Sequence, residues 1–270
     1  MEEKTYQTPC GTIHYWTNVS HPDEITLVFL PGLTADHRLF DKQIQHFKEK
    51  CNVVVWDAPA HAASWPSRFD FDLFDKAKWL NDILNQDKIA KPVIVGQSMG
   101  GYVGQAYAQL YPNRLTGFVS IDSAPLQRNY VTAVELWLLK RMEPVYAHYP
   151  WKLLLKSGTE GVATSDYGRN LMREMMLVYD GDQKRYAQIA GHGFRILAEA
   201  MEKNLPYELK CPSLLICGTQ DHAGSCIRYN REWHRKTKIP LKWIEGAGHN
   251  SNTDKPEMIN SLIEEFLSNI

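Results

Sequence analysis

The sequence lacks several features that mark other classes of protein. No apolar run approaches the roughly 18 residues that a membrane-spanning helix needs, and the polar start Met1-Glu2-Glu3-Lys4 is not followed by the apolar core of a signal peptide. Neither sign of charge is in excess, since 30 Lys and Arg stand against 31 Asp and Glu. A nucleic-acid binder usually shows a basic excess. We therefore expect a cytoplasmic protein with no membrane span and no nucleic-acid partner.

Cysteine is also scarce, and its spacing carries no metal motif. The five cysteines are odd in number and scattered, which argues against a secreted disulfide framework. Neither Cys-x-x-Cys nor His-Glu-x-x-His occurs, so a structural or catalytic zinc site has little support. Cys217 lies in an apolar run and is expected to be an inert, packed thiol. We expect no metal and no cofactor.

The strongest positive signal is the segment Gly96-Gln97-Ser98-Met99-Gly100. It directly follows the apolar run Val93-Ile94-Val95 and precedes a helical stretch, Tyr102 to Leu110. Gly-x-Ser-x-Gly between a buried strand and a helix is typical of the nucleophile elbow of serine hydrolases. The turn is so tight that small residues must flank the serine, which is held in a strained backbone conformation.

Apolar strand-like segments alternate with amphipathic helical segments along most of the chain. This order predicts an α/β fold with a mostly parallel sheet and helices on both faces. The first two strands are expected to form a hairpin around Pro9-Cys10-Gly11. The expected strands are 5–8, 12–16, 26–30, 52–56, 92–96, 115–121, 213–217 and 238–244. The expected helices are 36–50, 72–87, 102–110, 225–236 and 256–267.

One long segment breaks this alternation. Residues 126–209 lack a clear strand and are rich in aromatic residues and methionine. We interpret them as a helical cap inserted into a core made of residues 1–125 and 210–270. Ligands of open α/β sheets bind at the carboxyl edge of the strands, so the insertion could serve as a lid. The alternative is a helical layer packed on the side of the sheet.

A serine hydroxyl needs a base to take its proton, and the base is usually a histidine oriented by a carboxylate. After an elbow the chain order is Ser, then Asp or Glu, then His. His249 is the best base, because it lies in a small-residue loop after the last expected strand. Asp221, at the end of the strand 213–217, is the preferred acid, and Asp122 is the alternative. His222 is expected to be structural or to line a pocket.

The developing oxyanion needs two backbone N–H donors. One is expected from Met99, the residue after the nucleophile, and the other from the loop that follows the strand 26–30. Pro31 has no N–H, and Gly32 permits a tight turn. The second donor is therefore predicted to be Leu33.

Together these segments resemble the α/β-hydrolase superfamily over almost the full chain. The matching segments are 29–33, 55–61, 95–101, 215–221 and 246–249. The resemblance implies eight strands, a lid after the sixth strand and a Ser98–Asp221–His249 triad.

Two segments of the sequence differ from the pattern that is common in this family. Pro31-Gly32 occupies the place of a common His-Gly, which bears on how the Leu33 loop is braced.

The second departure lies in the loop after Asp57. Ala60 and Ala62 replace both glycines of the usual Asp-x-Pro-Gly-His-Gly, so that turn must avoid positive φ or accept strain. His61 is expected to brace the loop rather than to catalyse.

The leading hypothesis is a serine hydrolase that cleaves a small-to-medium, mainly apolar carboxylic ester through an acyl-enzyme. The same triad supports a lactonase, a carbon–carbon bond hydrolase or a thioesterase, because fold alone does not decide function. A serine nucleophile argues against dehalogenase or epoxide hydrolase chemistry, which uses aspartate at the elbow. The alternative from another functional class is a non-catalytic ligand receptor built on this fold.

Overall fold

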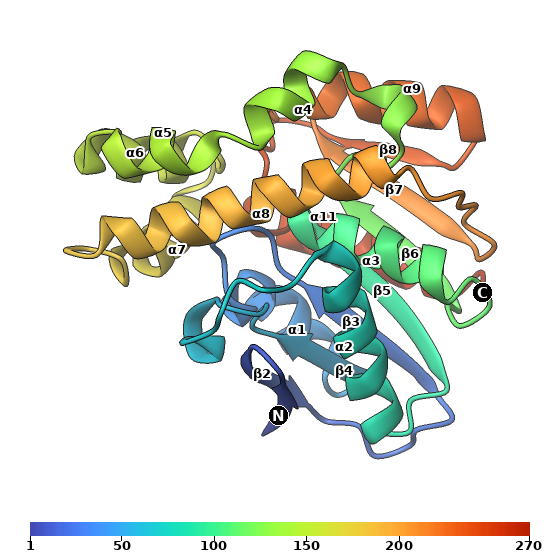
Figure 1. Ribbon diagram of the computed structural model, residues 1–270. Helices are drawn as coiled ribbons and strands as arrows, with labels where there is room; N and C mark the ends of the chain where they lie inside the picture. Colours follow the sequence, from blue (N-terminus) through green and yellow to red (C-terminus); the bar gives the residue numbers. More distant parts are fainter.

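The computed structural model describes residues 1–270 as an eight-stranded sheet flanked by helices (Figure 1). The strand order is β1-β2-β4-β3-β5-β6-β7-β8. β1 and β2 form an antiparallel hairpin, β2 pairs antiparallel with β4, and all other pairs are parallel. The predicted α/β class is thus confirmed. The strands are β1 Glu2–Thr8, β2 Gly11–Thr17, β3 Ile25–Leu30, β4 Asn52–Trp56, β5 Lys91–Gln97, β6 Gly117–Ile121, β7 Ser213–Gly218 and β8 Leu241–Ile244.

Helices cover both faces of the sheet because the central strands are apolar on both sides. Successive side chains of a strand point to opposite faces, and β3 illustrates this. Val28 packs in a core cluster with residues of α2 (Leu73–Gln86), α3 (Met99–Leu110) and α8 (Gln183–Lys203). Phe29 packs in a second cluster with residues of α1 (Asp41–Phe47) and α11 (Pro256–Leu267). The sheet therefore separates two cores.

Most predicted elements are confirmed, and the differences have local causes. The expected helix 36–50 is divided into a 3-10 turn, η1 His37–Phe40, and α1, because Asp36 accepts from the N–H of Arg38 and starts a separate tight turn. The last strand starts at Leu241 rather than residue 238. Lys238 has a left-handed φ of 64° and ends α9 (Cys226–Thr237), and Pro240 follows. β6 begins two residues later than expected.

The segment 126–209 contains helices and no strand, as its composition predicts. Its helices are η3 Arg128–Tyr130, α4 Ala133–Leu139, α5 Met142–His148, α6 Trp151–Glu160, α7 Asp166–Leu177 and α8. The long α8 contacts α2, α4 and α5 (Figure 1). The remaining short elements are η2 Ala62–Ser64 and α10 Ser251–Asp254. No helix is both long enough and apolar enough to cross a bilayer.

The start of α3 lies directly against the ends of β3 and β5. A Cβ atom on Gly100 would lie 1.8 Å from the carbonyl oxygen of Leu30, and one on Gly96 would lie 2.5 Å from the backbone of Gly100. Both obstacles are backbone, which cannot move aside as a flexible side chain can. Glycine is therefore required on both sides of Ser98 by close approach of the backbone.

The loop after β4 accepts strain. Ala60 has a φ of 71° and Ala62 a φ of 37°, so both alanines adopt conformations that favour glycine. Asp57 stabilises this loop, since its buried carboxylate accepts from the N–H of Ala63 at 2.9 Å. The sequence allowed this turn either to avoid positive φ or to accept strain, and the loop adopts the strained conformation.

We predict that Gly100→Ala lowers the free energy of unfolding by about 3 kcal/mol or more, because the added methyl group meets an immovable carbonyl. Gly181→Ala is the control. Gly181 has a φ of 80°, and a Cβ atom there would meet no heavy atom within 4 Å, so that substitution costs only the backbone strain, about 1 kcal/mol. Urea denaturation measures both. Equal losses would show that the contact with Leu30 is unimportant.

Ala62→Gly should stabilise the protein, because relief of about 1–2 kcal/mol of left-handed strain outweighs the added entropy of the unfolded chain. The neighbouring Ala63 is exposed and has no positive φ. Ala63→Gly should therefore destabilise by about 0.5–1 kcal/mol. The melting temperatures of the two variants should move in opposite directions, and a decrease in both would contradict the assigned strain.

Candidate active site

Ser98 sits at the joint between β5 and α3. Its φ of 48° and ψ of −115° lie outside the regions that a non-glycine residue normally occupies. The turn places the side chain at the carboxyl edge of the sheet, where a cavity opens. The N–H groups of Gly101 and Tyr102 already bond to the Ser98 carbonyl, at 2.9 and 3.4 Å. The N–H of Ser98 donates to the Ile121 carbonyl at 2.9 Å, so the backbone polar groups of this residue are all engaged and the hydroxyl is left to face the cavity.

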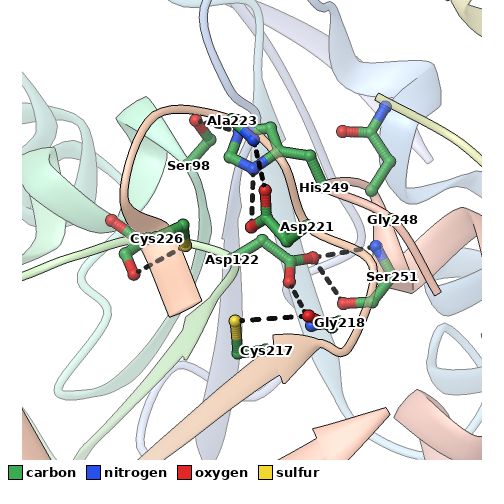
Figure 2. Close-up of polar contacts among 12 residues, drawn as sticks. Ser98, Asp122, Cys217, Gly218, Asp221, Ala223, Cys226, Gly248, His249 and Ser251 are labelled. Carbon is green, nitrogen blue, oxygen red and sulfur yellow. Dashed lines mark hydrogen bonds and ion pairs between the residues drawn. The ribbon is translucent and has the colours of Figure 1, made fainter. Parts of the chain in front are cut away.

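The three side chains singled out in the sequence come together in one hydrogen-bonded chain (Figure 2). His249 Nε2 lies 2.8 Å from Ser98 Oγ, and His249 Nδ1 lies 2.9 Å from Asp221 Oδ2. An ionised carboxylate can only accept, so Nδ1 carries the hydrogen and Nε2 accepts from the serine hydroxyl. The Asp221 side chain is fully buried, whereas 15% of the His249 side chain remains exposed.

The alternative acid, Asp122, occupies a different position. Its carboxylate accepts from the N–H of Gly218 at 2.8 Å, and from both the N–H and the hydroxyl of Ser251. It therefore ties the end of β7 to the residues just after His249 and makes no hydrogen bond to the imidazole (Figure 2). Of the two candidates, Asp221 contacts the histidine.

The electrostatics of the pair favour an ionised aspartate and a basic histidine. Burial on its own would raise the pKa of Asp221, but the adjacent His249 holds that pKa below its usual range. Burial would lower the pKa of His249, but the charge of Asp221 and its hydrogen bond raise it above the usual value. Burial and the nearby Asp221 raise the pKa of Asp122. A proton on the imidazole is thus stabilised by the carboxylate behind it.

The loop that carries His249 is held from several sides, by residues that the sequence did not single out. Gln97 Nε2 donates to the His249 carbonyl at 2.8 Å and to Asn250 Oδ1 at 3.1 Å. Asp254 accepts from the N–H of Gly248 at 2.8 Å. Gln97 precedes the serine, at the position that the elbow pattern leaves variable. Its role could not be derived from that pattern.

The same loop also contacts the segment between α6 and α7. The N–H of Asn250 donates to the Val162 carbonyl at 2.8 Å, and Thr164 Oγ1 donates to the Gly246 carbonyl at 2.8 Å. Asp254 accepts in addition from the N–H groups of Thr164 and Ser165. The segment between α6 and α7 and the histidine loop are therefore directly connected.

The two expected oxyanion donors lie beside the serine. Leu33 and Met99 line the same cavity as Ser98. A Cβ on Gly32 would lie 3.2 Å from Ser98 Cβ and 2.3 Å from the Gln97 side chain, so the loop after β3 passes directly over the elbow. The N–H of Leu33 makes no hydrogen bond within the protein. Pro31-Gly32 therefore brings a free backbone donor to this edge.

The other histidines of interest lie apart from this chain of bonds. His61 is buried, and its Nδ1 bonds to the Pro59 carbonyl at 3.0 Å. Burial, together with the charge of Lys76, lowers the pKa of His61 to about 3. His222 is exposed and lines a second cavity next to Asp221.

Two clusters contain groups that could ligate a metal, but their atoms are engaged elsewhere. The first comprises Cys217, Asp221 and Cys226. The hydrogen bond with Cys217 and, as the smaller cause, burial both raise the pKa of Cys226, which keeps its thiol protonated. The second comprises Asp36, His37 and Asp57. There Arg38 binds Asp36, and His37 and Ala63 bind Asp57.

The cavity at Ser98 has a volume of about 530 Å³ and a mostly apolar lining. Side chains of the helices within residues 126–209 form much of its wall, including Leu138, Leu154, Met176 and Phe194. No lysine or arginine lines it. Such a cavity suits an uncharged, apolar group of moderate size.

Comparisons with known proteins agree with this fold. The chain is 25% identical over 264 residues to the uncharacterized hydrolase YugF of Bacillus subtilis, covering 95% of each chain. It is 21% identical over 253 residues to 3-oxoadipate enol-lactonase 2 of Acinetobacter baylyi, covering 91% of this chain and 89% of the relative. The structure of a thermophilic esterase from Thermogutta terrifontis is similar with a TM-score of 0.75 and 19% identity, covering 100% of this chain and 99% of that one.

The family described as the alpha/beta hydrolase fold matches residues 25–256, which include the strands of the parallel sheet and all three bonded side chains. The chain therefore belongs to the α/β-hydrolase family.

Proposed function

We propose that this α/β hydrolase is a serine hydrolase that cleaves an apolar carboxylic ester through an acyl-enzyme. The observation that carries the proposal is the continuous path from Ser98 Oγ through His249 to Asp221, with contacts of 2.8 and 2.9 Å. A weak alcohol nucleophile becomes effective at neutral pH when a positioned base accepts its proton. No other group at this edge offers that arrangement to the Ser98 hydroxyl.

In the first step, Ser98 Oγ attacks the ester carbonyl carbon while His249 Nε2 accepts the hydroxyl proton. The buried carboxylate of Asp221 stabilises the resulting imidazolium and keeps the ring in its orientation. The carbonyl oxygen becomes negative as the tetrahedral intermediate forms. The backbone N–H groups of Leu33 and Met99 are proposed to receive that charge.

His249 then passes its proton to the leaving alcohol, and the carbon–oxygen bond of the ester breaks. A water molecule replaces the alcohol, gives a proton to His249 and attacks the acyl-enzyme. Collapse of the second intermediate releases the carboxylic acid and returns the proton to Ser98. The cycle consumes only water and substrate.

The lining of the cavity supports an apolar acyl group, since Leu154, Met176 and Phe194 face it and no cation does. Methionine adapts to irregular shapes, which favours tolerance of several acyl groups. The helices of residues 126–209 are proposed to act as the cap over this cavity. A second candidate is lactone opening, which the relative named as an enol-lactonase favours.

Ser98→Ala should abolish labelling by a fluorophosphonate probe and lower ester hydrolysis by at least about 10³-fold, because the variant retains the pocket but has no nucleophile. Intact-mass spectrometry measures the label, and p-nitrophenyl octanoate measures turnover. Circular dichroism checks the fold. Folded parent protein that takes up no label and turns over no ester would instead support a ligand receptor.

A substrate panel separates the candidate reactions. Aliphatic p-nitrophenyl esters of graded chain length, simple lactones and vinylogous diketones are compared by kcat/KM. We expect the medium-chain esters to be the best substrates, because they match the size and apolar lining of the cavity. A preference of several orders of magnitude for lactones or diketones would overturn the ester assignment.

Because the carboxylate of Asp221 raises the pKa of His249, kcat/KM should fall as the pH decreases through a value above the usual 6.5 of histidine. Below that pKa the imidazole is protonated and cannot accept the serine proton. Esters without ionisable groups report this free-enzyme pKa. A rate that stays flat from about pH 5 to 8 would count against His249 as the base.

Asp221→Asn should lower kcat by about 10⁴-fold, because the amide no longer stabilises the imidazolium or fixes its tautomer. Removal of the negative charge should also lower the pKa of His249, so the residual activity should persist to lower pH. Asp122→Asn is the matched control at the alternative acid. A larger loss of kcat in the control would reassign the acid.

A further inference from the structure

A second cavity of about 720 Å³ lies beside the first, between α9, η3 and the loop after β7. We call it the α9 groove. Its cationic lining residues are Arg228, Arg231, Arg235 and Lys236. The two cavities share three lining residues, Gly224, Ser225 and Tyr229. The α9 groove is therefore continuous with the wall of the cavity at Ser98.

The α9 groove holds a local excess of positive charge. Arg228 pairs with Glu135, at 3.1 Å. Arg235 and Lys236 share one carboxylate, that of Glu232, at 2.7 and 3.3 Å. Three of the four cations thus share two carboxylates.

Arg231 has no carboxylate partner and lies over the Trp243 ring, 5.4 Å from its centroid. The whole chain has a net charge of −1. Asp221 is a further carboxylate in the lining, so the four cations exceed the three carboxylates by one positive charge. This local excess in one concave site favours an anionic ligand.

The α9 groove adjoins the loop that holds the carboxylate partner of His249. His249 has to protonate the leaving group, so that group lies on the histidine side of the reacting carbonyl. Asp221 binds His249 and also lines the α9 groove, and the N–H of Ala223 bonds to Asp221 at 2.9 Å. The loop 221–225 thus joins the histidine to the cationic site.

The junction between the two cavities is built from α4 and α9, which lie next to each other (Figure 1). Glu135 of α4 accepts from the hydroxyl of Tyr229 and from Arg228. It also accepts from the N–H and hydroxyl of Thr132. These donors engage both oxygens of the Glu135 carboxylate, and the Asp221 carboxylate bonds to His249 and to the N–H of Ala223. An anion can therefore lie in the α9 groove without facing an unpaired negative charge.

We infer that the substrate has an apolar acyl group and a leaving group that carries phosphate, with the acyl group in the cavity at Ser98 and the phosphate in the α9 groove. This inference rests on the proposed function and names its substrate class. Arginine binds phosphate through several directed hydrogen bonds. A phosphorylated thiol or alcohol esterified to a medium-chain acid has this chemistry. In the reaction, Ser98 Oγ bonds to the acyl carbon, the bond to the leaving sulfur or oxygen breaks, and that atom takes the proton from His249.

The test compares two thioesters that differ only in the phosphorylated nucleotide, octanoyl-coenzyme A and octanoyl-pantetheine. At low salt we expect kcat/KM to be about tenfold or more higher for octanoyl-coenzyme A. The double variant Arg231→Glu/Arg235→Glu should bring the ratio of the two values close to one. Ionic strength of about 1 M, where screening reaches about 3 Å, should also reduce the ratio.

The control is Lys210→Glu/Lys242→Glu, which makes the same change in net charge at two exposed lysines outside the α9 groove. It should keep the parent's ratio. A ratio near one in the parent, or an equal decrease in the control variant, would overturn this inference and leave the proposed function intact. Failure of the folded parent to hydrolyse either thioester or p-nitrophenyl octanoate would overturn both.

Discussion

The close approach of α3 to the ends of β3 and β5 is the constraint on which the rest of the site depends. Gly100 leaves no room for a side chain against the Leu30 carbonyl, so the helix must start immediately after the strand. Ser98 then becomes the single residue that joins them and adopts a strained conformation. The contacts that enforce this conformation are backbone contacts buried between α3 and the ends of β3 and β5, and such surroundings can hold a strain of about 1–3 kcal/mol.

The position of the histidine follows from a second set of contacts that converge on a loop. His249 follows β8 by several residues, and a free loop would not hold an imidazole within 2.8 Å of a hydroxyl. Asp122 binds Ser251 on one side, Gln97 holds the His249 carbonyl, and Asp254 holds Gly248. These buried polar groups bond to backbone atoms, so they fix the path of the loop rather than one side chain. Such preorganisation would reduce the rearrangement that the proposed reaction requires.

The sequence could predict the parts of the molecule that local patterns determine. Buried strands such as β5 are continuous apolar runs, and the elbow requires small residues at fixed positions, so both are visible in single segments. The division of 36–50 into η1 and α1 depends on one Asp36 side-chain contact, and apolar spacing does not report it. The roles of Gln97 and Asp122 could not be predicted either, because their partners lie 96 residues or more away in the chain. Asp221 and Asp122 both follow buried strands, and only the arrangement in space separates them.

The distribution of charge shows how a whole-chain average can hide a site. A balance of 30 basic and 31 acidic residues argues against an extended polyanion partner, yet it sets no limit on the charge of one concave surface. The cavity at Ser98 has no cation, whereas the adjoining α9 groove has four. Screening limits the reach of exposed charges to about 10 Å at moderate salt, so each cavity presents its own local field to a substrate. A molecule that spans both would therefore be apolar at one end and anionic at the other, and its scissile bond would lie in the first cavity, beside Ser98 and His249.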